Sequence, residues 1–432
     1  MMDLHVMSEL SRNAFYQLSV SDVNARNYAL MCMAESLAEK KEEIFAANKV
    51  DLLEAEKEQL AAPLLHRLLF DNDKLKQVIQ GLNDLSRMED PLGKTTLARE
   101  LTEGLELYRI TCPIGVIGVI FESRPDALVQ IASLALKSGN TVLLKGGREA
   151  LRTNKVLCDA VRSGAVKAGL PADFAQLLET REDVSAMLKE DTLIDLIIPR
   201  GSKAFVRYIM DNSRIPVLGH SDGLCHVYID KAADIDKALN IAVDSKTQNV
   251  SVCNAAETLL VHEDIADRFL PAFSQAMKDK NVEVVGDRIS CSLMGCAPAT
   301  EEDWSTEYLD LKISVKTVDS PDEAIRHINR YGSHHTDCIV TEDQACAAHF
   351  LNAVDSAGVY WNVSTRFADG FVYGFGAEVG IATGKIHARG PMGLEGLTTY
   401  KYKLLGNGQT MSDVKAGNIS YTHRLLDRDC PV

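Results

Sequence analysis

Residues 115–145, GVIGVIFESRPDALVQIASLALKSGNTVLLK, contain two short apolar runs on either side of one longer apolar segment. The runs 115–121 and 141–145 are rich in Val, Ile and Leu, as expected for buried strands. The segment 126–137 has the length of a helix and ends before Gly139, a residue type that commonly terminates helices. A strand, a helix and a second strand in this order predict a βαβ unit and therefore a parallel sheet.

The same alternation continues toward the C-terminus. A helix over 149–168, a strand over 193–198 and a helix from Ser202 extend the first series. A second series begins near Asp230; it comprises helices 234–243, 266–277 and 320–331 and strands 257–262, 312–318 and 338–341. The two series predict an α/β fold with a doubly wound parallel sheet and a second α/β domain.

Four segments depart from this alternation. Residues 21–60 have amphipathic helical spacing, and residues 96–113 alternate around a central Glu-Gly as in a β-hairpin. Residues 282–305 have the least regular pattern, and the tail after Leu404 is rich in Gly and Asn. We expect the hairpin to be available for pairing with another subunit and the tail to be extended.

The composition is that of a globular protein. The 432 residues are 46% hydrophobic and 25% charged, which excludes wholesale disorder and allows two or three domains. The longest apolar stretches, 112–121 and 127–136, have about half of the roughly 20 residues that a membrane helix needs. The net charge of −15 disfavours nucleic acid as a partner. The N-terminus lacks the features of a signal or transit peptide, so a cytoplasmic location is expected, with the ten cysteines mostly free thiols.

Two strand ends carry residues suited to phosphate groups. Lys145-Gly-Gly-Arg148 follows one strand, and Arg200-Gly-Ser202 opens a helix whose free N–H groups can hold a pyrophosphate. No Gly-x-Gly-x-x-Gly follows a strand, and the glycines of 374–380 are wrongly spaced, so the ordinary dinucleotide fingerprint is absent. Each strand end alone could be a tight turn, but together they favour a nucleotide site.

A Gly-x-Ser-x-Gly pattern occurs at Gly219-His-Ser-Asp-Gly223. The nucleophile elbow of a serine hydrolase needs a strand before this pattern and a helix after it. Here residues 224–229 form another extended run, so a turn between strands is favoured. A hydrolase that uses Ser221 remains the alternative from a different enzyme class.

Cys253 stands in KTQNVSVCNAAETLLV, residues 246–261, within an irregular link before a strand. A lone cysteine is usually a small buried apolar residue, so its position alone assigns no function. Metal ligation is not expected, because the remaining clusters lack the paired spacing of a zinc site. These clusters are His334-His335 with Cys338, and Cys291 with Cys296.

A set of segments between Met88 and Tyr402 recurs in one known family. The segments are FESRPDALVQI (121–131), LKGG (144–147), IPRGS (198–202), IPVLGH (215–220), CHVYID (225–230), CNAAETLLV (253–261), GSHHTDCIVTED (332–343), STRF (364–367) and HARGPMGLEG (387–396). In this order they resemble the gamma-glutamyl phosphate reductases, or glutamate-5-semialdehyde dehydrogenases, of the aldehyde dehydrogenase superfamily. The ending Tyr421-Thr-His also resembles the reductase half of bifunctional pyrroline-carboxylate synthases.

The resemblance implies NADPH-dependent reduction of L-glutamyl 5-phosphate to L-glutamate 5-semialdehyde, with release of phosphate, in proline biosynthesis. Cys253 matches the nucleophile that forms a thioacyl enzyme, and a nearby cation such as Lys246 is expected to favour its thiolate. Ser123 and Asn254 are the other candidate catalytic residues, with Ser123 as a donor to the oxyanion. Segment 219–223 lacks the glutamate that activates water in oxidising members, which supports the reductive direction.

The resemblance also assigns binding residues. Lys145 is expected near the adenosine ribose, and Arg148 near a 2′-phosphate, which favours NADP over NAD. The full set of cofactor candidates is Lys145, Gly147, Arg148, Gly201, Ser202 and Glu307, with the last near the nicotinamide ribose. The doubly anionic acyl phosphate and the amino-acid carboxylate need cations, for which the candidates are Arg124, Arg366 and Arg389.

The expected architecture is an aldehyde-dehydrogenase-like α/β fold with three parts. Residues 1–235 form a Rossmann-type cofactor domain from which the hairpin 95–113 projects, and residues 236–375 form the catalytic domain. Residues 376–432 form a C-terminal return, whose strand near 397–404 is expected to pair with the hairpin across a subunit interface. A homodimer or homotetramer follows by analogy. A glutamate 5-kinase is a possible partner, and a non-catalytic companion of such a kinase is the third hypothesis.

Overall fold

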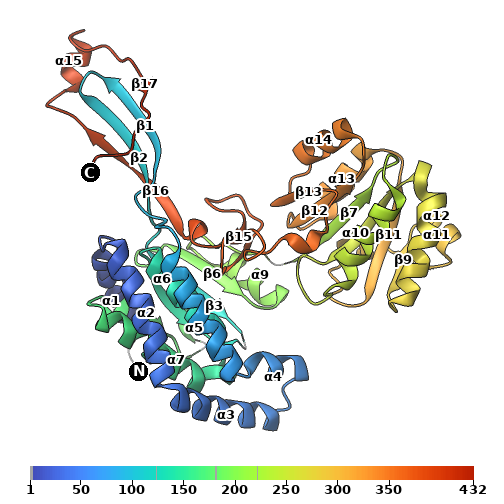
Figure 1. Cartoon of the computed structure of the whole chain (residues 1–432), viewed down its shortest axis with the longest axis horizontal. Helices are drawn as coiled ribbons and strands as arrows, with labels where there is room; N and C mark the ends of the chain where they lie inside the picture. The colour runs from blue at the N-terminus through green and yellow to red at the C-terminus, as the bar shows by residue number, and fades with distance from the viewer. Residues whose placement is uncertain (1–2, 123, 181, 221) are drawn as a thin grey trace.

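The computed structural model shows two α/β lobes and a projecting β-arm (Figure 1). It describes residues 3–122, 124–180, 182–220 and 222–432. The predicted α/β class with parallel sheets is confirmed. Within the described ranges, no helix is both long enough and apolar enough to cross a membrane.

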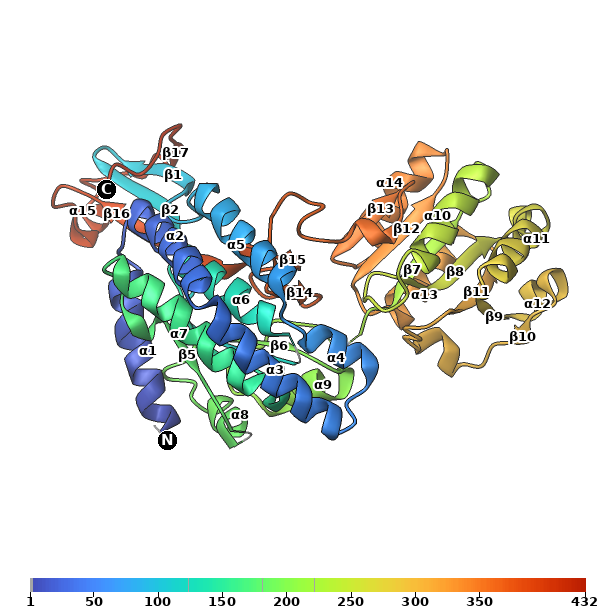
Figure 2. The ribbon, with the colours of Figure 1, turned by 60° about the horizontal axis from the view of Figure 1, so that its bottom comes forward.

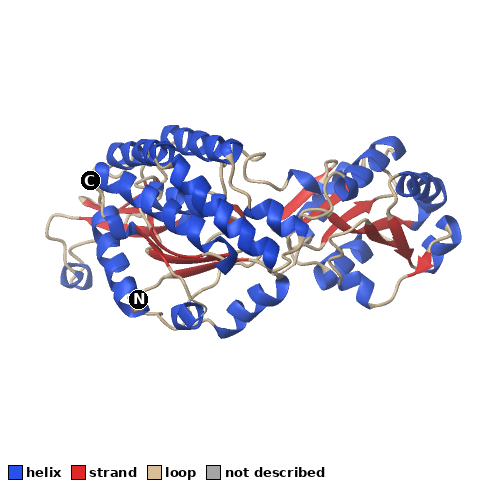
Figure 3. Cartoon of the chain, turned by 90° about the horizontal axis from the view of Figure 1, so that it is seen from below, coloured by secondary structure: helices blue, strands red, loops and turns tan. Residues whose placement is uncertain are grey.

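The first lobe is built on a four-stranded parallel sheet of order β5-β4-β3-β6. Its strands are β3 (Val116–Phe121), β4 (Thr141–Lys145), β5 (Ala175–Leu177) and β6 (Leu196–Arg200). Helices α6 (Pro125–Lys137), α7 (Leu151–Lys167), α8 (Glu182–Met187) and α9 (Lys203–Asn212) connect or follow them. Every residue of β3 and β4 is buried, because helices cover both faces of the sheet (Figure 3).

An N-terminal helical layer completes this lobe. It consists of α1 (Leu4–Leu18), α2 (Val23–Glu39), α3 (Lys41–Lys57), α4 (Ala62–Leu68) and α5 (Asn72–Arg87). Helices α2 and α5 pack against α6 and α7 in one continuous hydrophobic core with the sheet (Figure 2). Residues from the C-terminal return, among them Val379 and Met392, belong to the same core. The chain therefore returns to the first lobe after forming the second, before it enters the arm.

The second lobe contains a seven-stranded parallel sheet of order β10-β9-β11-β8-β7-β12-β13. Its strands are β7 (Cys225–Ile229), β8 (Ala256–His262), β9 (Glu283–Gly286), β10 (Ala297–Pro298), β11 (Lys312–Val318), β12 (Thr336–Val340) and β13 (Gly358–Trp361). Its helices are α10 (Ile235–Thr247), α11 (Glu263–Asp279), α12 (Arg288–Met294), α13 (Pro321–Tyr331) and α14 (Gln344–Ala353). Because β7 already belongs to this sheet, the lobe begins at Cys225 rather than after residue 235.

Residues 282–305 are more regular than their sequence indicates. They contain β9, α12 and β10, and α12 ends at Gly295 in the left-handed conformation (φ 68°) that favours glycine. The two strands have four and two residues, and the helix has seven, so none is long enough to show a clear hydrophobic period.

The arm confirms the hairpin but corrects its expected partner. It contains β1 (Thr95–Thr102), β2 (Leu105–Pro113), β16 (Thr398–Leu405) and β17 (Arg424–Leu425) in the order β16-β2-β1-β17. Strand β16 pairs with β2 of the same chain along its whole length, so the pairing expected across a subunit interface is made within one chain. The tail is not simply extended, because it also includes α15 (Met411–Lys415). A small antiparallel pair, β14 (Gly380–Ala382) and β15 (Gly390–Met392), lies at the base of the return.

Candidate active site

Cys253 lies in the loop that joins α10 to β8, at the end of the second sheet that faces the first lobe (Figure 1). The Cys225 thiol donates to the Cys253 carbonyl oxygen at 3.3 Å. A side chain at Gly223 would place its Cβ 2.2 Å from that same oxygen, so only glycine allows this close approach. Ser221 lies outside the described residues, and the strand β7 that follows the Gly-x-Ser-x-Gly pattern is not the helix that a hydrolase elbow requires.

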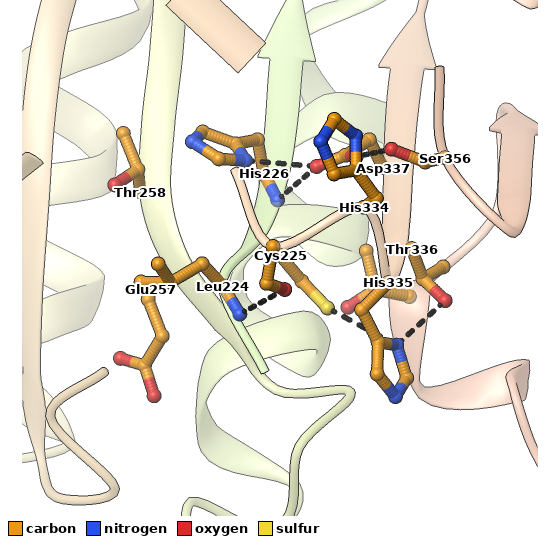
Figure 4. Close-up of polar contacts among 12 residues, drawn as sticks. Leu224, Cys225, His226, Glu257, Thr258, His334, His335, Thr336, Asp337 and Ser356 are labelled. Atoms are coloured by element: carbon orange, nitrogen blue, oxygen red, sulfur yellow. Dashed lines mark hydrogen bonds and ion pairs between the residues drawn. The ribbon is translucent and has the colours of Figure 1, made fainter. Parts of the chain in front are cut away.

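His335 is the side chain in polar contact with the Cys253 sulfur. Its Nε2 lies 3.2 Å from Sγ, and its Nδ1 lies 3.0 Å from Thr336 Oγ1. Figure 4 shows His335 turned toward Thr336 and Cys225, while the neighbouring His334 points the opposite way. Sequence reasoning considered the two histidines only as metal ligands and missed this contact, which joins residues 82 positions apart.

The imidazole of His220 packs against that of His335. The rings of His220 and His335 meet edge to face with centroids 5.2 Å apart, and His220 Nδ1 lies 2.9 Å from the Ile381 carbonyl oxygen. One nitrogen or sulfur atom from each of His220, Cys253 and His335 lies within 4.8 Å of the others, so the thiol and the two imidazoles form one cluster.

The site keeps both members of the Cys253–His335 contact neutral at pH 7. Burial raises the pKa of the Cys253 thiol to about 12; Glu307 and Glu378 add to this rise, and Arg200 opposes it. Burial lowers the pKa of His335 to about 3, and His220 acts in the same direction. The resting pair is therefore a thiol and an imidazole.

The expectation that Lys246 favours the thiolate is wrong. Lys246 is fully buried, and its Nζ forms an ion pair with Glu257 Oε2 at 2.7 Å. Glu257 also accepts the Leu309 N–H at 3.2 Å. The lysine belongs to the last turn of α10 and the glutamate to β8, so the pair braces both ends of the loop that carries Cys253.

The structure describes one of the two other candidate catalytic residues, Asn254. The Asn254 side chain donates to the carbonyl oxygens of Ala368 at 3.0 Å and Arg366 at 3.4 Å, so it fixes the 366–368 segment beside the nucleophile loop. Ser123 lies outside the described residues.

A cavity of 1050 Å³ opens onto Cys253 and is lined by both lobes. Arg124, one of the candidate substrate-binding residues, lines this cavity as expected. Its guanidinium also forms an ion pair with Asp126 at 3.1 Å. Lys74 and Arg67 line it too, although sequence reasoning treated the N-terminal helices as scaffold. Burial lowers the pKa of Lys74. Cations from three separate segments therefore gather where the thiol is exposed.

The other two candidate arginines are placed differently. Burial lowers the pKa of the Arg366 guanidinium, the nearby Cys253 thiol acts in the opposite direction, and its Nε donates to Gln248 at 2.9 Å. Arg366 is thus held beside the nucleophile. Arg389 is bound by Asp355 at 3.0 Å and lines a different cavity near the arm, so the structure does not support it as a substrate ligand.

The cofactor candidates of the first lobe share a second cavity, of 1030 Å³. Lys145, Gly147 and Arg148 line it at the carboxyl end of β4. A Cβ at Gly147 would lie 2.0 Å from the Glu149 carboxylate, so the Glu149 side chain packs directly over this glycine. Arg148 is 80% exposed in its side chain and forms an ion pair with Glu58 at 2.9 Å. These residues fit the adenosine end of a nicotinamide dinucleotide.

The remaining cofactor candidates lie at the start of α9 and beside the nucleophile loop. Ser202 caps α9, where free backbone N–H groups suit a pyrophosphate. A Cβ at Gly201 would lie 3.0 Å from Glu122, so this turn is tightly packed. Glu307 accepts the Gly223 N–H at 2.9 Å and therefore stands next to the nucleophile loop, as a ligand of the nicotinamide ribose would.

Comparison with known proteins agrees with this geometry. The aldehyde dehydrogenase family model matches residues 2–291. The gamma-glutamyl phosphate reductases of Pelotomaculum thermopropionicum and Acetivibrio thermocellus are 58% and 57% identical to the chain; the alignments cover 99% and 100% of it and 99% and 100% of those proteins.

Solved structures give the same result. The crystal structure of gamma-glutamyl phosphate reductase from Thermotoga maritima superposes with a TM-score of 0.93 at 39% identity, covering 95% of this chain and all of that one. An acetylating aldehyde dehydrogenase from Geobacillus thermoglucosidasius shares the fold alone, with a TM-score of 0.62 at 16% identity over 94% of this chain and 97% of that one. The chain therefore belongs to the aldehyde dehydrogenase family, and within it to the gamma-glutamyl phosphate reductases.

Proposed function

We propose that the chain reduces L-glutamyl 5-phosphate to L-glutamate 5-semialdehyde with NADPH and releases phosphate, as a step of proline biosynthesis. The observation that carries the proposal is the position of Cys253 in a cavity lined by Arg67, Lys74 and Arg124. A thiol attacks the acyl carbon, and the cations attract a substrate that is doubly charged at its phosphate and again at its carboxylate. The names of the full-length relatives support the same reaction.

The reaction proceeds in two parts on Cys253. The sulfur displaces phosphate and becomes acylated, and NADPH, when bound, supplies the hydride that reduces the thioester. Arg124 and Lys74 hold the phosphate as it leaves, and Arg366, beside the thiol, holds the remaining anionic group. Segment 219–223 contains no glutamate that could activate water. The thioester is therefore reduced rather than hydrolysed.

The resemblance placed Lys145 near the ribose and Arg148 near the 2′-phosphate; we propose instead that the buried Lys145 holds the 2′-phosphate, since Arg148 is exposed and paired with Glu58. Lys145→Met is expected to weaken NADPH binding by about 10- to 100-fold and to change NADH binding much less, because the ammonium would be lost from the 2′-phosphate and from a buried site. Arg148→Met is the matched control and should have a smaller effect, because Arg148 is exposed and already paired with Glu58. Fluorescence titration with each coenzyme measures both. Equal losses for NADPH and NADH would assign Lys145 to the ribose instead.

We also propose that the arm joins copies of this chain into a homodimer or homotetramer. Strand β16 is an edge of the arm sheet, so one row of its backbone groups is unpaired within the chain. The side chains of Tyr400, Tyr402 and Leu404 are each more than half exposed along it. A glutamate 5-kinase remains a possible further partner.

The reverse reaction tests the proposed function directly. Purified protein is mixed with glutamate semialdehyde, in equilibrium with pyrroline-5-carboxylate, together with phosphate and NADP, and the absorbance of reduced nicotinamide is followed. We expect NADPH formation that requires phosphate. Folded protein that binds NADPH and yet forms none would point to the non-catalytic kinase companion, and formation that is independent of phosphate would contradict an acyl-phosphate substrate.

A further inference from the structure

We propose that His335 is the general base of this site: its Nε2 takes the proton from the Cys253 thiol as the sulfur attacks, and later returns it. The proposal deepens the proposed function, since it concerns the same thiol, but its geometry is independent of which acyl group is bound. His335 touches the reacting atom, with Nε2 3.2 Å from Sγ. It is 1% exposed, so bulk water does not compete for that contact.

The proposed role needs the hydrogen of the neutral imidazole on Nδ1, and the surroundings of the ring allow this tautomer. His335 Nδ1 lies 3.0 Å from the Thr336 hydroxyl oxygen, which can accept an N–H from the ring. Cys225 Sγ lies farther away, at 3.7 Å, and that thiol already donates to the Cys253 carbonyl oxygen. With the hydrogen on Nδ1, the lone pair of Nε2 points at the Cys253 thiol. Figure 4 shows Thr336 and Cys225 on the Nδ1 side of the ring.

The charged groups around the pair decide when the proton moves. His220 faces His335, while Glu307, Glu378 and Arg200 act on Cys253. Burial and the two carboxylates hold the thiol neutral, and burial holds the imidazole neutral. The free thiolate of Cys253 is therefore not populated in the resting protein. The proton passes to Nε2 as the C–S bond forms, because the sulfur becomes far more acidic while it gives its electrons to carbon.

The proton and electrons balance over the cycle. In acylation the S–H bond breaks, the C–S bond forms, and the C–O bond to phosphate breaks; the proton passes through Nε2 to the departing oxygen, so that phosphate leaves as the hydrogen phosphate dianion. In reduction, bound NADPH would supply the hydride that adds to the thioester carbon, and the C–S bond would break with its electron pair going to sulfur. The leaving sulfur takes a proton that neutral His335 relays from solvent, and the neutral pair is restored.

The test uses alkylation of Cys253 by iodoacetamide, which needs neither substrate nor coenzyme. At pH 7, His335→Asn is expected to slow this alkylation by about 100-fold, the lower range for loss of a general base. In the wild-type protein the rate should be nearly constant from pH 6 to 9, because His335, with a pKa of about 3, is neutral throughout. In the variant the rate should rise about tenfold per pH unit, because only the thiolate, with a pKa of about 12, still reacts.

The neighbouring histidine supplies a matched control. His334→Asn removes an imidazole whose Nδ1 lies 2.5 Å from the Asp355 carbonyl oxygen, and asparagine tolerates the positive φ of 61° at that position. Its alkylation rate should equal that of the wild-type protein. Mass spectrometry of the peptide that contains Cys253 distinguishes this thiol from the other nine. A His335→Asn variant that reacts at the wild-type rate, with the same flat pH profile, would overturn the proposal.

Two further variants separate a chemical role from a structural one. His335→Ala should regain alkylation and turnover when imidazole is added, since free imidazole can occupy the vacated space. Thr336→Val removes the acceptor for Nδ1–H but keeps the shape, so it should lower kcat and leave KM nearly unchanged. No rescue at any imidazole concentration, in a variant with wild-type thermal stability, would overturn the role as base. If alkylation behaves as expected while the reverse reaction fails, the base is retained and only the proposed substrate is wrong.

Discussion

Cys253→Ala is expected to abolish phosphate-dependent NADPH formation, with a loss of about 10⁴-fold or more. The reason is chemical: without the sulfur no acyl enzyme forms, and the remaining cations can bind substrate but cannot attack it. The substitution is also structurally mild. Two contacts of this loop involve the backbone of Cys253: the Cys225 thiol donates to its carbonyl oxygen, and Gly223 packs against it. Alanine at position 253 keeps both contacts. NADPH binding and the thermal melting point should therefore stay close to wild-type values.

Two controls make this result specific. Cys291→Ser changes another thiol of the second lobe. Its sulfur lies in α12 and contacts Cys296 and the Gly286 carbonyl oxygen, so this variant should retain full turnover. Ser221→Ala tests the hydrolase alternative and should also retain turnover. If Ser221→Ala removed activity and Cys253→Ala preserved it, the assignment of the nucleophile would be reversed.

The parts of the fold that sequence predicts well are those whose burial is uniform. Strand β3, helix α6 and strand β4 follow the apolar runs almost residue for residue, because their burial demands nearly continuous apolar side chains. Strand β11 also has the predicted bounds, although its two lysines are only half-buried. The short elements in 282–305 escape prediction, because two- to seven-residue segments are held by their neighbours in the sheet rather than by their own pattern.

The candidate site divides in a similar way. Cys253 and the cofactor candidates lie in short continuous segments that resemble those of a known family, so they could be proposed from the sequence. His335 could not, because its contact with Cys253 depends on β7, β8 and β12 beginning side by side at one edge of a parallel sheet. The role expected for Lys246 is wrong for the same reason. Its nearness in sequence to Cys253 does not reveal that its ammonium forms an ion pair with Glu257 in the folded chain.

Lys246→Met is expected to destabilise the second lobe by about 3 kcal/mol at pH 8, because it leaves the Glu257 carboxylate buried without its cation. Even beside Lys246, burial raises the pKa of Glu257 to about 7. Without the lysine that pKa rises further in the folded state and stays near its ordinary value in the unfolded chain. A carboxyl with a raised folded pKa costs no stability below its unfolded pKa; the cost grows as pH rises above the unfolded pKa and reaches its full value above the folded pKa. The loss should therefore be largest at pH 8 and small at pH 5.

The double variant Lys246→Met/Glu257→Gln separates charge from packing. Glutamine keeps an oxygen for the Leu309 N–H and removes the buried charge, so most of the lost stability should return and its pH dependence should disappear. Urea unfolding followed by tryptophan fluorescence reports on this lobe, because both tryptophans of the chain, Trp304 and Trp361, belong to it. Equal destabilisation of the single and double variants at both pH values would show that packing, not the ion pair, holds the ends of α10 and β8 around the nucleophile loop.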